Sequence, residues 1–243
     1  IQSSPELGIR YKKASGIFDS GRNYKEAQSV VDEVCELILQ DKEESIGIVA
    51  MNSQQRDEIE SQLELRLSKD SRLQDLYDKK MKSHEPVFVK NLENVQGDER
   101  DVIVISMTYG PSQVGGKVFQ RFGPINQSSG WRRLNVLFTR SKKRMHVISS
   151  MNSSDILSSE SSSKGVTALK AFLRYCETGF LHEEKVTGKA PDSDFEIAVI
   201  KALEKHGYEC EPQLGVAGYF LDLAVKNPAN PGEYLLAVEC DGA

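Results

Sequence analysis

Apolar positions along the first two thirds of the chain follow two alternating patterns. Continuous apolar runs of strand length predict buried strands at residues 46–51, 102–106 and 146–149. Apolar residues recur at helical spacing over 23–40, where Asn23 can cap the helix, and a polar helix is predicted from 53 or 54 to about 67. Strand, short turn and helix in this order predict an α/β unit, in which each helix crosses over to a parallel strand.

The pattern is weaker at several places. Gly8–Tyr11 and Gly16–Phe18 are candidate short strands, and 70–82 is expected to be a helix or loop at the surface. On the helix predicted over 23–40, Glu26 and Glu33 are expected to face outward.

The last third divides into a connection and a second patterned region. Residues 151–163 are rich in serine, which is typical of a flexible connection, and an amphipathic helix is predicted over 164–177 with Gly179 at its end. Beyond a linker the pattern restarts, and it predicts a helix at 194–206 and strands at 208–213, 219–225 and 234–240. We therefore expect three regions, namely 1–152, 153–190 and 191–243.

Composition narrows the class of protein. The 243 residues include 31 Lys or Arg and 36 Asp or Glu, a net charge of -5, so nucleic-acid contacts must come from local patches. The four cysteines are dispersed without C-x-x-C spacing, which argues against a zinc site and a disulfide framework. No apolar run approaches the length of a membrane span, and a cytoplasmic protein fits best.

Six basic residues with no acidic residue among them stand close together between the strands predicted at 102–106 and 146–149. They are Arg132, Arg133, Arg140, Lys142, Lys143 and Arg144. A solvated helix face is the plain interpretation of such a run. The packed elements on either side favour a second one, in which arginines held in place bind phosphates.

Three segments stand out: Gln96-Gly97-Asp98-Glu99, the stretch from Arg132 to Ser141, and the strand at 46–51 with Gln55-Arg56. Together they resemble superfamily 1 helicases, and their sequences are most similar to the Upf1-like branch. Gln96-Gly97-Asp98-Glu99 before a strand looks like motif V, and the stretch from Arg132 to Ser141 looks like motif VI. The strand at 46–51 with Gln55-Arg56 after it is similar to motif IV. This resemblance implies a RecA-like parallel sheet domain, the second of the two in such a motor.

The resemblance also implies roles for single residues. Gln96, Gly97 and Glu99 would belong to the loop that couples nucleotide to nucleic acid, and Arg133 and Arg140 would join them at the ATP site. Arg140 would be the arginine finger on the γ-phosphate, because the charge on a transferring phosphoryl group must be met by a fixed guanidinium. Arg56 would be a second phosphate-contacting arginine, although a residue near a helix start can equally be a surface residue.

A Walker A motif is not found in this sequence. Tyr109–Val118 ends in a Gly-Gly-Lys, but Pro111 stands where the first glycine of G-x-x-x-x-G-K-[ST] is required, and Val118 replaces the magnesium-binding hydroxyl. We therefore expect a fragment of a longer helicase that does not hydrolyse ATP without the first RecA-like domain. Nucleic acid, with single-stranded DNA favoured, is the expected partner.

Three carboxylates mark a second candidate site near the end of the chain. If the strands predicted at 219–225 and 234–240 pair as a hairpin, Asp222, Glu239 and Asp241 can converge on a magnesium or manganese ion. The alternative is that these acids are solvated at strand ends. Carboxylates set inside apolar strands are costly unless something neutralises them.

This last region resembles the start of a very-short-patch-repair-like PD-(D/E)XK nuclease domain. The resemblance matches Asp222, Glu239 and Asp241 to the acidic positions and Glu196 to the helix acid, but Asp241 stands where a lysine is usual. The sequence as a whole predicts an α/β protein: a RecA-like domain, a linking helix and a partial α/β restriction-endonuclease-like domain. A nucleic-acid-binding scaffold with a degenerate ATPase and a non-catalytic docking domain is the alternative.

Overall fold

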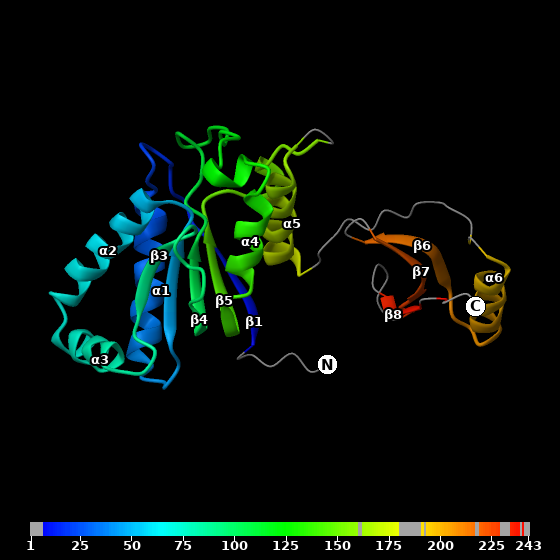
Figure 1. The fold of residues 1–243 in the computed structure, drawn as a ribbon, viewed down its shortest axis with the longest axis horizontal. Coiled ribbons are helices and arrows are strands. Elements are labelled where there is room, and N and C mark those ends of the chain that lie inside the picture. Colours follow the sequence, from blue (N-terminus) through cyan, green and yellow to red (C-terminus); the bar gives the residue numbers. More distant parts are fainter. Residues whose placement is uncertain are drawn as a thin grey trace. The chain divides into compact units, whose positions relative to one another are not determined.

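A computed structural model describes residues 7–159, 162–179, 191, 193–216, 219–228, 234–238 and 240. The chain falls into two compact units, Ile1–Gly179 and Phe180–Ala243, which are described separately below (Figure 1).

The first unit is built on a five-stranded, wholly parallel sheet with the order β1-β5-β4-β2-β3. Its strands are β1 (Gly8–Lys13), β2 (Ile46–Ala50), β3 (Phe88–Asn91), β4 (Arg100–Ser106) and β5 (Ser141–Ser149). Its helices are α1 (Tyr24–Leu39), α2 (Ser53–Leu67), α3 (Ser71–Met81), α4 (Gly130–Phe138) and α5 (Lys164–Thr178), with 3-10 turns η1 (Gly123–Asn126) and η2 (Ser153–Asp155). The predicted RecA-like α/β class is confirmed.

Helices cover both faces of this sheet, which explains the continuous apolar runs of its central strands. In β4, Val102 and Val104 belong to the core beneath α1, α2 and α3, whereas Ile103 and Ile105 belong to the core beneath α4 and α5. A strand buried on both faces has no solvent-facing positions and loses the alternation of apolar and polar residues.

Caps fix where the helices begin and end. The side chain of Asn23 accepts a hydrogen bond from the amide of Glu26 at 3.2 Å, so the predicted cap of α1 is confirmed. Asn52 caps α2 in the same way. Gly179 ends α5 as predicted, with φ +78 in the left-handed region that glycine adopts without strain.

Two expectations for the first 40 residues were wrong. Gly16–Phe18 is not a strand, although Gly8–Tyr11 lies in β1. Glu26 does not face outward: its side chain is completely buried, and its carboxylate accepts hydrogen bonds from Ser106 Oγ at 2.7 Å and from the Ser150 amide at 2.7 Å. The first turn of α1 lies at the carboxyl ends of β4 and β5, which supply these two donors.

The serine-rich segment also differs from expectation, because its described part is packed. The amide of Asn152 donates to Asp155 Oδ2 at 2.7 Å, and Ile156 is fully buried in the core under α5. Ser153 Oγ donates to Glu177 on α5 at 2.6 Å. Polar side chains here satisfy a tight turn instead of forming a free tether.

Helix α5 belongs to the first unit. Its buried face, which includes Leu169 and Phe172, is part of the core that also holds α4. Phe172 stacks on Phe138 of α4 with ring centroids 3.9 Å apart. The region expected as 153–190 therefore starts with residues that complete the RecA-like layer, while the boundaries at 152 and 190 stay predictions.

The second unit contains one helix and a three-stranded antiparallel sheet in the order β6-β7-β8. The helix is α6 (Asp194–Lys205), and the strands are β6 (Cys210–Val216), β7 (Tyr219–Lys226) and β8 (Tyr234–Val238). The predicted hairpin is confirmed, since β7 pairs with β8 with Leu223 opposite Val238. None of the helices in the described part of the chain has the length and apolar character needed to cross a bilayer.

Candidate functional site

Arg140 lies between the end of α4 and the start of β5, and its side chain is held from two sides. Nε donates to the carbonyl oxygen of Val136 at 2.9 Å, and one terminal nitrogen donates to Thr139 Oγ1 at 3.0 Å. The other terminal nitrogen lies 3.8 Å from Glu99 Oε1, beyond hydrogen-bond length. The guanidinium is thus oriented by neutral acceptors, and within the described part of the chain its ion pair is the long one to Glu99.

The loop that carries Gln96, Gly97 and Glu99 joins β3 to β4. Gly97 has φ +89, a conformation that side-chain-bearing residues rarely adopt, and Gln96 and Glu99 are exposed. An ion pair of 2.6 Å between Lys90 Nζ and Asp98 Oδ2 anchors the middle of the loop. The loop therefore presents its polar side chains from a fixed backbone, next to Arg140.

Three other basic residues of the acid-free run, Lys142, Lys143 and Arg144, are paired with acids, which corrects the expectation of one phosphate site. Arg144 donates two hydrogen bonds of 2.6 Å to the carboxylate of Glu44. Lys142 pairs with Glu85 at 2.5 Å, and Lys143 lies 3.4 Å from Asp101. Acids that are remote in sequence lower the net charge here, and burial of Arg144 requires such a partner.

Arg56 sits in the first turns of α2, after a residue that is fully buried. Its Nε donates to Asp57 Oδ1 at 2.9 Å and lies 3.8 Å from Glu60 Oε2 on the same helix. Its neighbour Gln55 bridges Asn23 and Ser106, donating 3.1 Å hydrogen bonds to the Asn23 carbonyl and to Ser106 Oγ. The start of α2 is thus fixed to α1 and β4, while the guanidinium of Arg56 engages acids on its own helix.

Arg133 lies in the first turn of α4. It donates to Ser129 Oγ at 3.0 Å and to Gln127 Oε1 at 3.3 Å. Its hydrogen bonds within the described residues therefore go to the segment just before its own helix.

Topology divides these residues between the two edges of the parallel sheet. Arg140 and Glu99 directly precede β5 and β4, whose first residues pair, so both lie at the amino edge. Arg56 follows β2 at the carboxyl edge, whereas Arg133 lies within α4, the helix that leads to Arg140. A seven-residue strand such as β4 is roughly 23 Å long at about 3.3 Å per residue. The structure brings Arg140 to Glu99 and separates both from Arg56.

The polar network under the carboxyl edge was missed by sequence reasoning. Glu26 is surrounded there by Ser106, Thr108 and Ser150, and burial raises its pKa to about 7 although these hydrogen bonds oppose the shift. Two of its donors, Thr108 and Ser150, lie more than 80 positions from Glu26 along the chain. Helical periodicity therefore gives no sign of them. The sequence feature that could have indicated this network was the pair of polar residues at helix starts, Asn23 and Gln55.

In the second unit, Asp222 reaches the end of β8. Its Oδ2 accepts a hydrogen bond of 2.7 Å from the backbone amide of Cys240, the residue between Glu239 and Asp241. Glu239 and Asp241 themselves lie outside the described residues, and among the described ones no group of three or more His, Cys, Asp or Glu is placed to hold a metal. Glu196 of α6 is buried and accepts from Gln213 Nε2 at 3.2 Å.

These features define the class of the first unit: it is a RecA-like α/β domain, with an anchored arginine and a polar loop at one edge of its sheet. The chain belongs to the AAA_12 family of AAA domains, a Upf1-like helicase family, whose model matches residues 7–152. Residues 195–243 match a second model, REase_MTES_1575, so the chain joins a helicase-like domain to a nuclease-like one.

Two curated relatives carry helicase names. The chain is 31% identical over 227 residues to the "Uncharacterized ATP-dependent helicase MG140" of Mycoplasma genitalium, covering 91% of the chain and 19% of the relative. It is 33% identical over 209 residues to the homolog of that protein in Mycoplasma pneumoniae, covering 85% of the chain and 17% of the relative. The chain therefore spans less than one fifth of the length of these relatives.

Proposed function

We propose that the chain is the second RecA-like domain of an ATP-dependent superfamily 1 nucleic-acid helicase, fused to a metal-dependent endonuclease-like domain. The observation that supports the helicase part of this proposal is the arrangement of residues at the amino edge of the sheet. There Arg140 is held by Val136 and Thr139 and lies 3.8 Å from Glu99, the last residue of the loop that also carries Gln96 and Gly97. The names of the two relatives, both ATP-dependent helicases, support the same function.

Arg140 is suited to act as the arginine finger because its geometry is set before ATP arrives. A guanidinium that is already oriented and only weakly paired can stabilise charge on the γ-phosphate without first breaking a strong salt bridge. The first RecA-like domain of the same polypeptide would supply the Walker lysine and the magnesium ligand. Glu99, exposed beside Arg140, would contact the nucleotide from the motif V loop.

Arg56 and Arg133 take a different part in this proposal. Arg56 follows β2 at the carboxyl edge of the sheet, the edge opposite to Arg140, and Arg133 lies about two helical turns before Arg140 along α4. We propose Arg140 alone as the γ-phosphate arginine of this domain. Arg56 and Arg133 would instead face the backbone phosphates of the bound strand, which single-stranded DNA would supply.

Discrimination between ATP and ADP tests this assignment. In the whole protein, Arg140→Ala should abolish most of the preference for a slowly hydrolysed ATP analogue over ADP, while Arg56→Ala should keep that preference. The measurement is the ratio of the two dissociation constants, obtained by competition with a fluorescent nucleotide. Lys142→Ala, which removes a neighbouring cation already paired with Glu85, is the matched control. An unchanged ratio in Arg140→Ala, or a loss confined to Arg56→Ala, would move the γ-phosphate contact to another residue.

The second half of the proposal concerns Asp222, Glu239 and Asp241. The hydrogen bond from the Cys240 amide holds the Asp222 carboxylate against the segment that carries both other acids. Carboxylate oxygens at such a place suit magnesium or manganese, which would activate a water to cut a phosphodiester. Support comes from the family model that covers 195–243.

Metal-dependent cleavage of DNA by the whole protein tests this half. Asp222→Asn keeps the size of the side chain and one oxygen acceptor but removes the charge that a cation needs, so cleavage should fall by about 100-fold or more, the scale of losing one well-placed electrostatic group. Unchanged cleavage would exclude Asp222 as a ligand. Absence of any cleavage in the wild type would favour a docking domain in place of a nuclease.

A further inference from the structure

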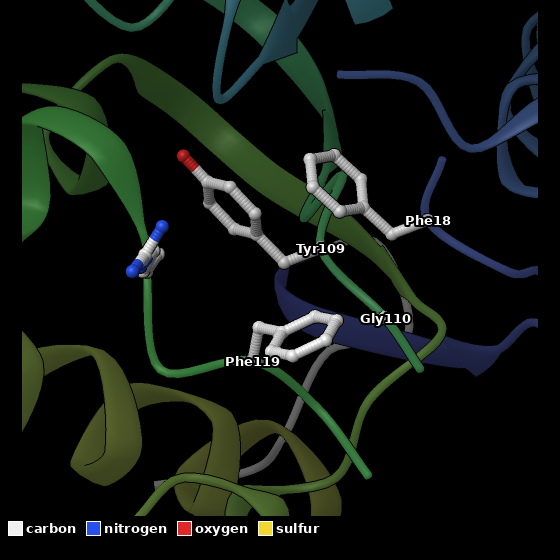
Figure 2. Close-up of a pocket in the computed structure, with 5 residues that line it drawn as sticks. Phe18, Tyr109, Gly110 and Phe119 are labelled. Atoms are coloured by element: carbon white, nitrogen blue, oxygen red, sulfur yellow. The ribbon is translucent and has the colours of Figure 1, made fainter. Parts of the chain in front are cut away.

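A small pocket at the carboxyl edge of the first unit is lined by aromatic side chains. Phe18, Tyr109, Gly110, Phe119 and Arg121 enclose about 330 Å³, near the lower end of the range for small-molecule sites. Figure 2 shows the rings of Phe18, Tyr109 and Phe119 around one shared space. Tyr109 and Gly110 belong to the loop that follows the carboxyl end of β4, which places the pocket at the edge opposite to Arg140.

One wall of the pocket is buried and packed, and the other is exposed to solvent. The ring of Tyr109, 4% exposed, packs edge-on against Phe18 at 5.4 Å and against Phe122 at 5.3 Å. The Phe18 amide donates to the carbonyl of Pro111 at 2.9 Å, which ties that ring to the loop after β4. Phe119, in contrast, is 65% exposed. The pocket therefore combines a packed aromatic wall with an aromatic face that a planar ligand can reach from solvent.

The floor of the pocket is closed by a glycine. A Cβ at Gly110 would lie 3.1 Å from Ser150 Cβ and 3.2 Å from Asn23 Nδ2, so the backbone approaches the buried polar network closely. That network includes Glu26, which receives the Ser150 amide. The backbone at Gly110 is thus backed by a hydrogen-bonded network.

One of the residues that line the pocket, Arg121, is charged, and its positive charge suits a phosphate. Arg121 is exposed, and its side chain forms no ion pair or hydrogen bond with other residues in the part of the chain that the structure describes. An aromatic slot beside an unpaired arginine is the combination that holds the base and the phosphate of one nucleotide.

We propose that this pocket binds one base of the single-stranded nucleic acid on which the motor acts, by stacking the base against Phe119 beside Tyr109. Arg121 contacts the phosphate next to that base. This inference rests on the proposed function. The contact is stacking on the π-face of a base, which every base has, so the pocket would accept any base. A free nucleotide offers the same ring, but the pocket lies at the edge away from Arg140, which favours the strand.

Binding of two strands to the 243-residue chain tests the pocket. One is a short fluorescent oligothymidylate and the other is the same strand with abasic sites, both followed by anisotropy at one salt concentration. Phe119→Ala should raise the dissociation constant for the base-bearing strand by about 5- to 100-fold and leave that for the abasic strand unchanged. Phe119→Trp should keep wild-type affinity. Phe195→Ala, a phenylalanine 57% exposed in the other unit, is the matched control.

The outcomes distinguish a failure of the base-binding pocket from a failure of the proposed helicase function. Equal binding of the base-bearing strand by wild type and Phe119→Ala, or an equal loss on both strands, would overturn the pocket and leave the helicase assignment intact. Displacement of the strand by ATP in a Phe119-dependent way would assign the pocket to a free nucleotide and overturn the strand contact. If the wild-type chain bound neither strand, the nucleic-acid part of the proposed function would fail together with the pocket. Arg121→Gln should lower the salt dependence of strand binding by about 0.7 in log-log slope, and an unchanged slope would remove the phosphate contact.

Discussion

At the scale of single residues, Glu26 shows how a buried carboxyl group joins a helix to two strands. Its carboxylate accepts from Ser106 on β4 and from the Ser150 amide after β5, and burial raises its pKa to about 7 from the usual value near 4.5. A raised pKa means that the folded state binds a proton that the unfolded state releases between about pH 4.5 and 7. The free energy of unfolding contributed by Glu26 is therefore greatest below pH 4.5 and declines as the pH rises through 7.

This sign gives a prediction for Glu26→Gln. The variant cannot titrate at this position, whereas the wild type loses stability as the pH rises. The free energy of unfolding of Glu26→Gln minus that of the wild type should therefore increase by up to about 3 kcal/mol from pH 5 to pH 8. Urea denaturation followed by the fluorescence of Trp131, the single tryptophan of the chain, reports on the first unit. A difference between variant and wild type that stays constant with pH would show that Glu26 keeps its ordinary pKa.

At the scale of elements, the sequence predicted those that apolar residues define. α1, β2, α2 and β4 follow from continuous or periodic apolar patterns and lie within a few residues of the expected bounds. β5 was predicted only from 146, but it starts at Ser141 because Lys142, Lys143 and Arg144 are paired with acids from other segments. Charged residues inside a strand carry no hydrophobic signal.

The candidate site was predictable to the same extent. Motif order placed Glu99 and Arg140 near each other, and they lie 3.8 Å apart at their closest nitrogen and oxygen. The separation of Arg56 from them depends on the strand order, which periodicity does not encode. The aromatic pocket was missed for a similar reason, because Phe18 and Phe119 are brought together across about 100 residues by the crossing of two loops.

Helix α5 gives a prediction at this scale. Because Phe172 is 7% exposed and stacks on Phe138 of α4, Phe172→Ala should destabilise the first unit by about 3–5 kcal/mol. Lys164→Ala, an exposed residue at the start of the same helix, should change stability little. Both are measured by urea denaturation with Trp131 fluorescence. A small effect of Phe172→Ala would mean that α5 is only a tether between the units.

At the scale of the whole molecule, the chain combines a RecA-like domain with a nuclease-like unit. The amino edge of the parallel sheet carries Arg140 and Glu99, and the carboxyl edge carries the aromatic pocket and the start of α2 with Arg56. In the proposed motor these two edges would serve ATP and the strand, and the sheet with its two covered faces would connect them. The strand and the nucleotide would thus be sensed by opposite ends of the same five strands.

Single-strand-stimulated ATP hydrolysis by the whole protein tests this account most directly, with wild type and Arg140→Ala compared at matched strand binding. The account predicts hydrolysis that rises with added single-stranded DNA in the wild type, and a loss of about 10³-fold or more in Arg140→Ala with strand binding retained. Lys142→Ala, which removes a cation already paired with Glu85, should hydrolyse ATP as the wild type does. Wild-type protein that binds the strand but shows no stimulated hydrolysis would contradict the account and indicate a nucleic-acid-binding scaffold.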